Sequence, residues 1–240
     1  MLAKSLAIVL GAVKYGDSSV ILKTYSRNFG LISFIAGGVR GKKGGMKSAM
    51  ILPLNQGELV FYEKAKGSLK RLKEFSIPRL YSEMYFHPVK NCLAMFLAEV
   101  LSHVLKEEEA DPQLFDFISE SLFQLDSQQS ELANFHLHFL LKLSGNLGFQ
   151  AEIAGDDKAY FDLQNGIYLS TEPHHPYFLK DKLLQNWKQL TLSVESGNSI
   201  DRYSGKERAE LLEALLTYYR LHINDFGELK SLEVLQTILH

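Results

Sequence analysis

The feature that most constrains the fold is a change in hydrophobic periodicity at Ile77-Pro78. Before it, short runs of β-branched and aromatic residues alternate with glycine-containing segments, as is typical of strands joined by turns. These runs cover residues 6–14, 18–25, 30–37, about 50–63 and 69–77. The pattern predicts five antiparallel strands. A unit of this size closes most readily as a small barrel such as an OB-fold, and an SH3-like barrel fits almost as well.

After Pro78 the apolar residues recur at helical spacing. Helix boundaries are indicated at His87-Pro88, Asp111-Pro112, Leu132 to Leu147 before Gly148, the capping box of Ser204 with Glu207, and Ser231 to Leu239. Residues 149–178 differ, because glycines, prolines and paired aspartates interrupt brief apolar runs there. We therefore predict an α+β chain with an OB-fold domain over residues 1–79. An all-helical domain over residues 80–240 follows, with an irregular loop or small hairpin inserted at about 149–178.

Composition excludes several classes of protein. The single cysteine, Cys92, can form neither an internal disulfide nor a four-cysteine zinc site. No apolar run approaches the roughly 18 residues needed to cross a bilayer, and the first 15 residues lack a signal-peptide cleavage site. We expect a cytoplasmic protein with no membrane contact.

Charge is strongly segregated along the chain. Residues 1–79 hold 14 Lys and Arg against four Asp and Glu, a balance of +10, whereas the rest of the chain carries −12. Clustered cations repel one another unless a polyanion binds them, so the first third is expected to bind nucleic acid. The alternative is a solvated basic face that contacts the acidic remainder of the same chain.

The densest basic signal is the glycine-rich segment 37–48, which joins the third and fourth predicted strands. Its four cations are Arg40, Lys42, Lys43 and Lys47. A loop of this composition can follow a phosphate backbone of varied shape. Gly41-Lys42 resembles a Walker A motif only superficially, because Lys43 stands where a magnesium-binding Ser or Thr is required, so nucleotide hydrolysis is not expected. A solvated loop without a ligand is the alternative.

A second cluster, composed of Lys64, Lys66, Lys70, Arg71 and Lys73, surrounds the last predicted hairpin. Edge strands often carry lysine to prevent edge-to-edge pairing, so this cluster alone is a weak signal. Together with segment 37–48 it could form one positive surface. Aromatic residues lie among these cations and could either stack on bases or fill the barrel core: Tyr15, Tyr25, Phe29 and Tyr62.

No active site or metal site is visible in the sequence. His136 and His138 are two residues apart, which places them on different faces of a helix, and no H-E-x-x-H motif is present. His174-His175 lacks cysteine partners for a metal. We expect no catalytic residues, no metal and no cofactor.

Residues 24–30 (Thr-Tyr-Ser-Arg-Asn-Phe-Gly) and 36–43 (Ala-Gly-Gly-Val-Arg-Gly-Lys-Lys) resemble the RecO family of bacterial recombination mediators. The resemblance continues through residues 77–81 and the Leu-Gly-Phe at 147–149, and covers about residues 1–150. It implies an OB-fold and a helical domain without enzymatic turnover. Such proteins bind single- and double-stranded DNA and anneal complementary strands. They also bind the C-terminal tail of single-strand binding protein and join RecR, which helps to load RecA.

One departure from the family concerns zinc, because many members carry a four-cysteine module where residues 150–175 here contain no cysteine. We expect this insertion to be held by its own packing, through Tyr160, Phe161, Ile167, Tyr168 and Leu169. The resemblance also implies a groove for the partner tail in the helical domain. The first residues to test for it are His138, Phe139 and Lys142.

These observations together predict a DNA repair and recombination mediator of the bacterial cytoplasm, associated with the nucleoid. The predicted DNA-binding residues are Arg27, Arg40, Lys42, Lys43, Lys47, Lys64, Lys66, Lys70, Arg71, Lys73, Tyr25 and Phe29. An RNA-binding barrel protein and a protein-only adaptor, whose basic face receives an acidic peptide, are the alternative interpretations.

Overall fold

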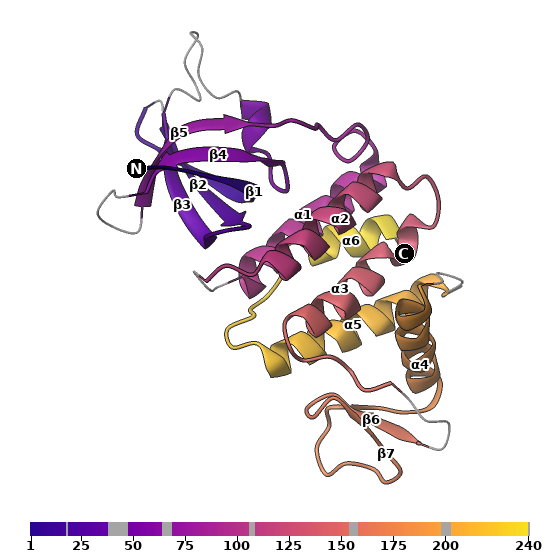
Figure 1. The fold of residues 1–240 in the computed structure, drawn as a ribbon. Helices are drawn as coiled ribbons and strands as arrows, with labels where there is room; N and C mark the ends of the chain where they lie inside the picture. The colour runs from indigo at the N-terminus through magenta and orange to yellow at the C-terminus, as the bar shows by residue number, and fades with distance from the viewer. Residues whose placement is uncertain are drawn as a thin grey trace. The chain divides into compact units, whose positions relative to one another are not determined.

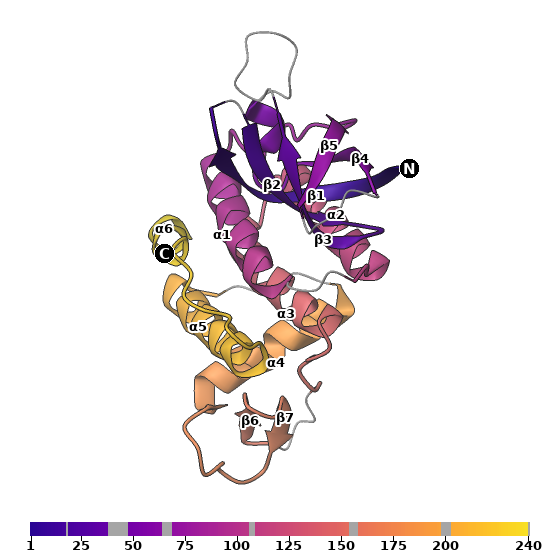
Figure 2. The ribbon, with the colours of Figure 1, turned by 90° about the vertical axis from the view of Figure 1, so that its left-hand side faces the viewer.

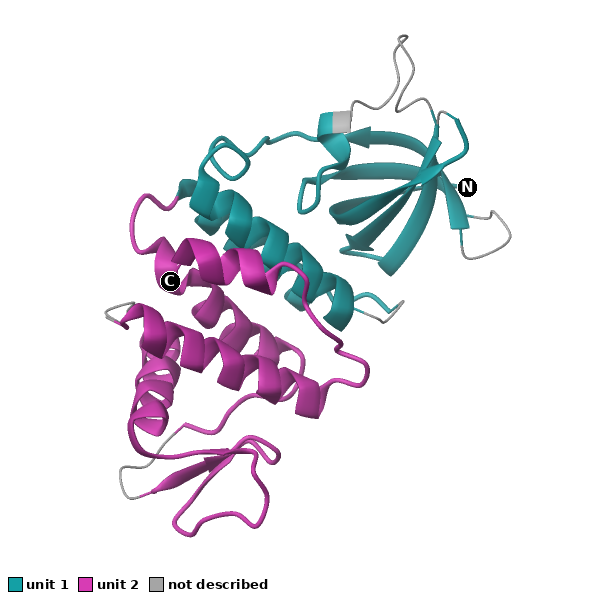
Figure 3. Ribbon diagram, turned by 180° about the vertical axis from the view of Figure 1, so that it is seen from behind, with its two compact units in different colours: residues 1–127 teal, residues 128–240 magenta. Residues whose placement is uncertain are grey.

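The computed structural model describes the chain in seven stretches: residues 1–17, 19–37, 48–63, 69–105, 109–153, 158–197 and 203–239. It forms two compact units, Met1–Ser127 and Gln128–His240 (Figure 3). The sequence predicted a domain boundary at 79/80, at the end of the strands. The two compact units divide between Ser127 and Gln128, so the first unit contains the first two long helices as well as the barrel. The boundary at 79/80 stays a prediction.

The first unit begins with a closed five-stranded barrel (Figure 1). Its strands are β1 (Leu2–Tyr15), β2 (Ser19–Ser26), β3 (Gly30–Ala36), β4 (Gln56–Tyr62) and β5 (Leu69–Ser76). They close in the order β1-β2-β3-β5-β4, and only the β3–β5 pair is parallel. This is the connectivity of an OB-fold, which confirms the predicted fold class.

Alternate side chains along the strands point inward and fill the barrel interior. The buried core consists of Ala7, Val9, Leu22, Phe34, Leu59, Phe61 and Phe75. Gly57 is required by this packing, since a Cβ atom there would lie 2.5 Å from the Phe75 ring and from the Ser76 carbonyl oxygen. A short 3-10 helix, η1 (Ser48–Ile51), precedes β4.

Two helices complete the first unit, α1 (Pro88–Val104) and α2 (Pro112–Ser127). Both begin at the predicted prolines. The His87 side chain accepts a hydrogen bond from the Lys90 amide at the start of α1. The Asp111 carboxylate accepts one from the Leu114 amide, 2.9 Å away, at the start of α2.

The second unit consists of helices and one small sheet. Its elements are η2 (Leu132–Asn134), α3 (Phe135–Asn146), β6 (Tyr160–Asp162), β7 (Ile167–Leu169), β8 (Phe178–Leu179), α4 (Asp181–Ser196), α5 (Gly205–His222) and α6 (Leu232–Leu239). The predicted capping box is present at the start of α5. No helix in the described parts of either unit has the length and hydropathy required of a membrane span.

The insertion forms a three-stranded antiparallel sheet in the order β7-β6-β8. Phe161 and Tyr168 are buried as predicted, and the Phe161 ring lies 5.1 Å from Trp187. Ile167 is 41% exposed, so its predicted role in this packing is wrong. The buried Asp162 carboxylate accepts hydrogen bonds from the amides of Gln164 and Asn165 and so holds the β6–β7 turn.

Candidate nucleic-acid interface

The side chains of β2 alternate between the barrel interior and its outer face. Leu22 and Thr24 are fully buried, whereas Ile21 and Lys23 are partly exposed. Because strand residues two apart share a face, Ile21, Lys23 and Tyr25 all belong to the outer face. The orientation of Lys23 is therefore set by strand alternation.

Strand register places further residues beside them. Lys23 pairs with Ser33 of β3, and Ile21 pairs with Ile35, which in turn pairs with Arg71 of β5. We call the surface made by these five residues the β2–β3–β5 face. None of the five is acidic. This part of an OB-fold barrel commonly contacts oligonucleotides.

Two of the predicted DNA-binding cations of β5, Arg71 and Lys73, are exposed. Arg71 lies on the β2–β3–β5 face, and Lys73 lies at the bulge where the β4–β5 register shifts. Lys70 is half-buried and pairs in register with the core residue Phe34. Lys23 was absent from the predicted site, although alternation within β2 would have found it.

Six other predicted cations lie outside the described residues. They are Arg40, Lys42, Lys43, Lys47, Lys64 and Lys66. In the sequence they belong to the connections from β3 to η1 and from β4 to β5. Their part in an interface stays a prediction.

Helix α2 covers the end of β2 (Figures 1 and 2). The Tyr25 ring is only 3% exposed and packs against Phe115 at a centroid distance of 6.2 Å. Tyr25 pairs in register with Ile8 of β1, and Ile8 pairs with Gln56 of β4. The Gln56 side chain accepts a hydrogen bond from the Ser119 hydroxyl of α2, so the helix contacts both β2 and β4 here. A ring covered in this way has no face open to a base. The prediction that Tyr25 stacks on bases is therefore wrong.

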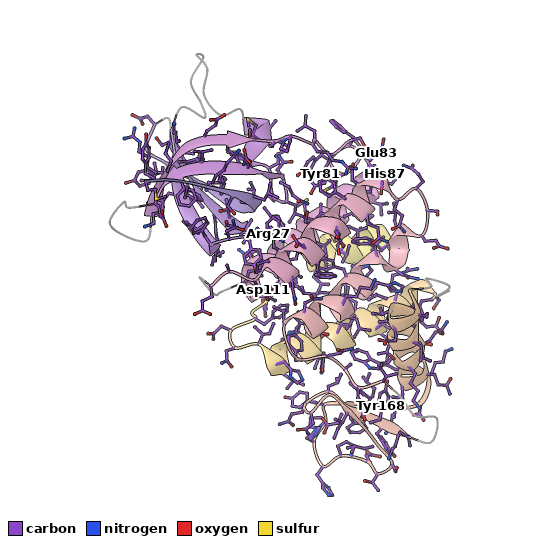
Figure 4. All side chains as sticks on the ribbon, viewed as in Figure 1. Arg27, Tyr81, Glu83, His87, Asp111 and Tyr168 are labelled. Atoms are coloured by element: carbon purple, nitrogen blue, oxygen red, sulfur yellow. The ribbon has the colours of Figure 1, made fainter. Side chains whose placement is uncertain are left out.

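Arg27 and Phe29 are also engaged by the fold. The Arg27 guanidinium donates two hydrogen bonds to Asp116 of α2, with N–O distances of 2.8 and 2.7 Å. Figure 4 labels Arg27, which lies where the barrel meets the helices of the first unit. Phe29 is half-buried against the barrel core, edge-on to Phe61 at 5.2 Å. The structure thus assigns Phe29 to core packing, and Arg27 has a carboxylate partner.

The β1–β4 side of the barrel has a different character. Leu2 pairs with Tyr62 there, and the Lys4 ammonium lies 2.7 Å from the Glu58 carboxylate. Tyr15 and Tyr62 are about half exposed. Both tyrosines are accessible for stacking, whereas Tyr25 is not.

The predicted groove residues of the second unit lie on α3. Phe139 is 3% exposed and stacks on Phe135, so its ring does not line a surface groove and that prediction is wrong. His138 lies 3.3 Å from the Ser193 hydroxyl, and Lys142 is exposed. These two remain candidates for contact with a partner.

The two histidines of the pair 174–175 have different surroundings. His175 lies 3.3 Å from the buried Asp162 carboxylate, and His174 is exposed. Within the described stretches, no three His, Cys, Asp or Glu residues gather as metal ligands would.

Comparison with known proteins decides the family. The family model "Recombination protein O N terminal" matches residues 1–81, and "Recombination protein O C terminal" matches residues 86–172. The chain belongs to the RecO family. It is 35% identical to the DNA repair protein RecO of Christiangramia forsetii over 239 residues, which is 99% of both chains. The RecO proteins of Flavobacterium psychrophilum and Bacteroides fragilis are 32% and 34% identical over 244 residues, again 99% of each chain. RecO similarity thus extends beyond the 150 residues that carried the resemblance.

Proposed function

We propose that this chain acts in DNA repair and recombination by binding single- and double-stranded DNA on the β2–β3–β5 face. In this role it anneals complementary strands and helps to load a recombinase onto protein-coated single strands. Membership of the RecO family supports the general role. The observation that carries the proposed site is the strand register that gathers Lys23 and Arg71 on one outer face, with Lys73 close by in β5.

Electrostatics supplies the mechanism. Each cation that neutralises a phosphate releases condensed counterions, so affinity should fall steeply with salt and depend little on base sequence. Neutralised backbones also allow two complementary strands to approach each other. The partly exposed Ile21 and Ile35 offer apolar contact between the cations. Cations on a surface can track the backbone of a single strand whatever its base sequence.

The test removes the described cations of this site. We expect a Lys23→Ala/Arg71→Ala/Lys73→Ala variant to bind a single-stranded oligonucleotide at least tenfold more weakly. The slope of log affinity against log salt should fall by about 2, which corresponds to three phosphate contacts on a single strand. Fluorescence anisotropy over a salt series measures both quantities.

A matched control removes three lysines that already have carboxylate partners. Lys4, Lys182 and Lys206 lie 2.7, 3.3 and 3.8 Å from Glu58, Glu207 and Glu210. Their triple alanine variant changes the net charge of the chain by the same amount. Equal losses in the two variants would show that total charge matters and the β2–β3–β5 face does not.

Partner binding is the second part of the proposal. Lys142 and His138 of α3 are the first residues to test against a peptide from the acidic tail of single-strand binding protein. Annealing of complementary oligonucleotides coated with that protein, with and without RecR, tests the mediator role. A competing ribose oligonucleotide of the same sequence distinguishes DNA from RNA as the ligand.

A further inference from the structure

Three residues along the outer side of β2 and its continuation are cationic or aromatic, and α2 contacts two of them. Lys23, Tyr25 and Arg27 are spaced by two residues and so share one side of the chain. The Arg27 amide donates to the Leu6 carbonyl oxygen at 2.9 Å, which continues the β1–β2 pairing one residue past the end of β2. Lys23 has no carboxylate partner among the described residues. Tyr25 lies under Phe115, and Arg27 is held by Asp116.

The Arg27–Asp116 contact has the geometry of ligand recognition. Arg27 Nε lies 2.8 Å from Asp116 Oδ1, and Nη2 lies 2.7 Å from Oδ2. Two parallel hydrogen bonds of this kind are how a guanidinium binds either a carboxylate or a phosphate. The pair raises the pKa of Arg27 and lowers the pKa of Asp116, in both cases mainly through the side-chain hydrogen bond between them.

Both side chains are accessible to solvent. The Arg27 side chain is 40% exposed and the Asp116 side chain is 47% exposed. Exposed ion pairs are weak and are screened by salt. A strand with a high local density of phosphate can therefore compete with one carboxylate for this guanidinium.

Arg27 also lies within reach of a strand bound at Lys23. Four residues of extended chain separate the two Cα atoms by about 13 Å. Because Phe115 covers Tyr25 between the two cations, a DNA strand bound at Lys23 and Arg71 would reach Arg27 by passing around the edge of α2. At that position it would meet the Asp116 carboxylate.

We propose that the Asp116 carboxylate occupies the position on Arg27 that a DNA phosphate would take. Asp116 thereby masks Arg27 and limits the affinity of the barrel for DNA. This inference rests on the proposed function. A bound strand gains Arg27 as an additional contact only when it displaces Asp116. The clasp of Asp116 on Arg27 thereby keeps binding reversible, which suits a protein that must bring strands together and then release them.

The experiment is a double-mutant cycle in the full-length chain, read by anisotropy with a thymidine oligonucleotide of about 16 nucleotides, the upper site size of one OB-fold. Asp116→Asn preserves the shape of the side chain and removes its charge. The matched control is Glu120→Gln, one turn further along α2, where the exposed carboxylate has no cationic partner among the described residues. Arg27→Ala is made in the wild-type and Asp116→Asn backgrounds.

We expect Asp116→Asn to tighten binding about three- to tenfold and to steepen the salt slope by about 0.7, the contribution of one further phosphate contact on a single strand. Glu120→Gln should change affinity less than twofold. Arg27→Ala should have little effect in the wild-type background, where Arg27 is masked. In the Asp116→Asn background it should abolish the gain.

The clasp is refuted if Asp116→Asn and Glu120→Gln behave alike, or if Arg27→Ala weakens binding equally in both backgrounds. A lowered Tm for Asp116→Asn with unchanged affinity would show a structural tie between α2 and the barrel instead. The wild type could bind the oligonucleotide and the Lys23/Arg71/Lys73 variant fail to, while Asp116→Asn has the same affinity as Glu120→Gln. That result would refute the masking of Arg27 by Asp116 and leave the proposed DNA-binding face intact. Absence of wild-type binding would remove both proposals.

Discussion

Replacement of Asp126 by asparagine should destabilise the first unit by about 2 to 4 kcal/mol. Asp126 lies near the end of α2 and is 6% exposed. Its Oδ1 accepts hydrogen bonds from the amides of Glu83 and Met84, both at 2.8 Å, and its Oδ2 accepts from the amide and hydroxyl of Ser82 at 3.0 and 3.2 Å. One carboxylate therefore organises the turn that leads from the barrel to α1.

The predicted loss of unfolding free energy follows from which of these hydrogen bonds an asparagine side chain can accept. Its oxygen can keep the bonds from Glu83 and Met84, now without the negative charge. Its NH₂ group faces the Ser82 amide, so two donors oppose each other and that amide loses its partner. A hydrogen bond to a charged acceptor contributes about 1.5 to 3 kcal/mol, and an unsatisfied buried amide costs about 1 to 3 kcal/mol.

Urea-induced unfolding followed by circular dichroism measures the effect, with Glu120→Gln as an exposed control expected within about 0.5 kcal/mol of wild type. Burial raises the pKa of Asp126, but the hydrogen bonds from Ser82, Glu83 and Met84 together outweigh it, so the pKa lies below its ordinary value. The stabilisation is thus complete above the unfolded-state pKa of about 3.9 and is lost as pH falls through the lower folded value. The difference between wild type and Asp126→Asn should therefore shrink in acid. A difference under about 0.5 kcal/mol at neutral pH, or one that is independent of pH, would contradict this account.

Two further predictions concern local structure and use the same unfolding assay. Gly57→Ala should lower the free energy of unfolding by about 2 to 4 kcal/mol, because the added Cβ would lie 2.5 Å from the Ser76 carbonyl oxygen. The control, Gly11→Ala, meets no atom within 4 Å and should be nearly neutral. Similar losses for both variants would show that the barrel relaxes around Gly57. Ser204→Ala should cost about 1 kcal/mol by removing the cap of α5. Hydrogen bonds from the Ser204 amide and hydroxyl lower the pKa of Glu207 to about 2. The capping box should therefore persist well below pH 4 and weaken only as the pH approaches this pKa. Amide exchange at the start of α5 would measure the change.

The fold was largely predictable because its signals are local. Alternation and glycine spacing mark all five strands of the barrel, and the prolines at 88 and 112 mark two helix starts. Helix α4 was not predicted from the sequence. Its N-cap residue is Lys180, which is not one of the Ser, Thr, Asp or Asn residues that mark a helix start in a sequence.

The site was less predictable, because exposure depends on contacts between residues far apart in the sequence. Tyr25 and Tyr62 look alike in the sequence, since both lie among cations. The structure buries Tyr25 under Phe115, which is 90 positions later, and leaves Tyr62 about half exposed. Lys23 was predictable in principle, because alternation with the buried Leu22 and Thr24 places it outward.

Charge segregation along a chain overstates the charge available to a polyanion. Of the cations in the barrel, Lys4 is offset by Glu58 within the same sheet, and Arg27 is offset by Asp116 from α2. The helix that buries Tyr25 of β2 thus also pairs with Arg27, the next outward cation, one residue past the end of that strand. If the β2–β3–β5 face binds DNA as we propose, α2 affects it in two ways. Phe115 bounds the accessible part of the outer face of β2, and Asp116 offsets a positive charge beside it. Under that proposal, substitutions at the adjacent residues Phe115 and Asp116 should alter the position of the interface and its affinity separately.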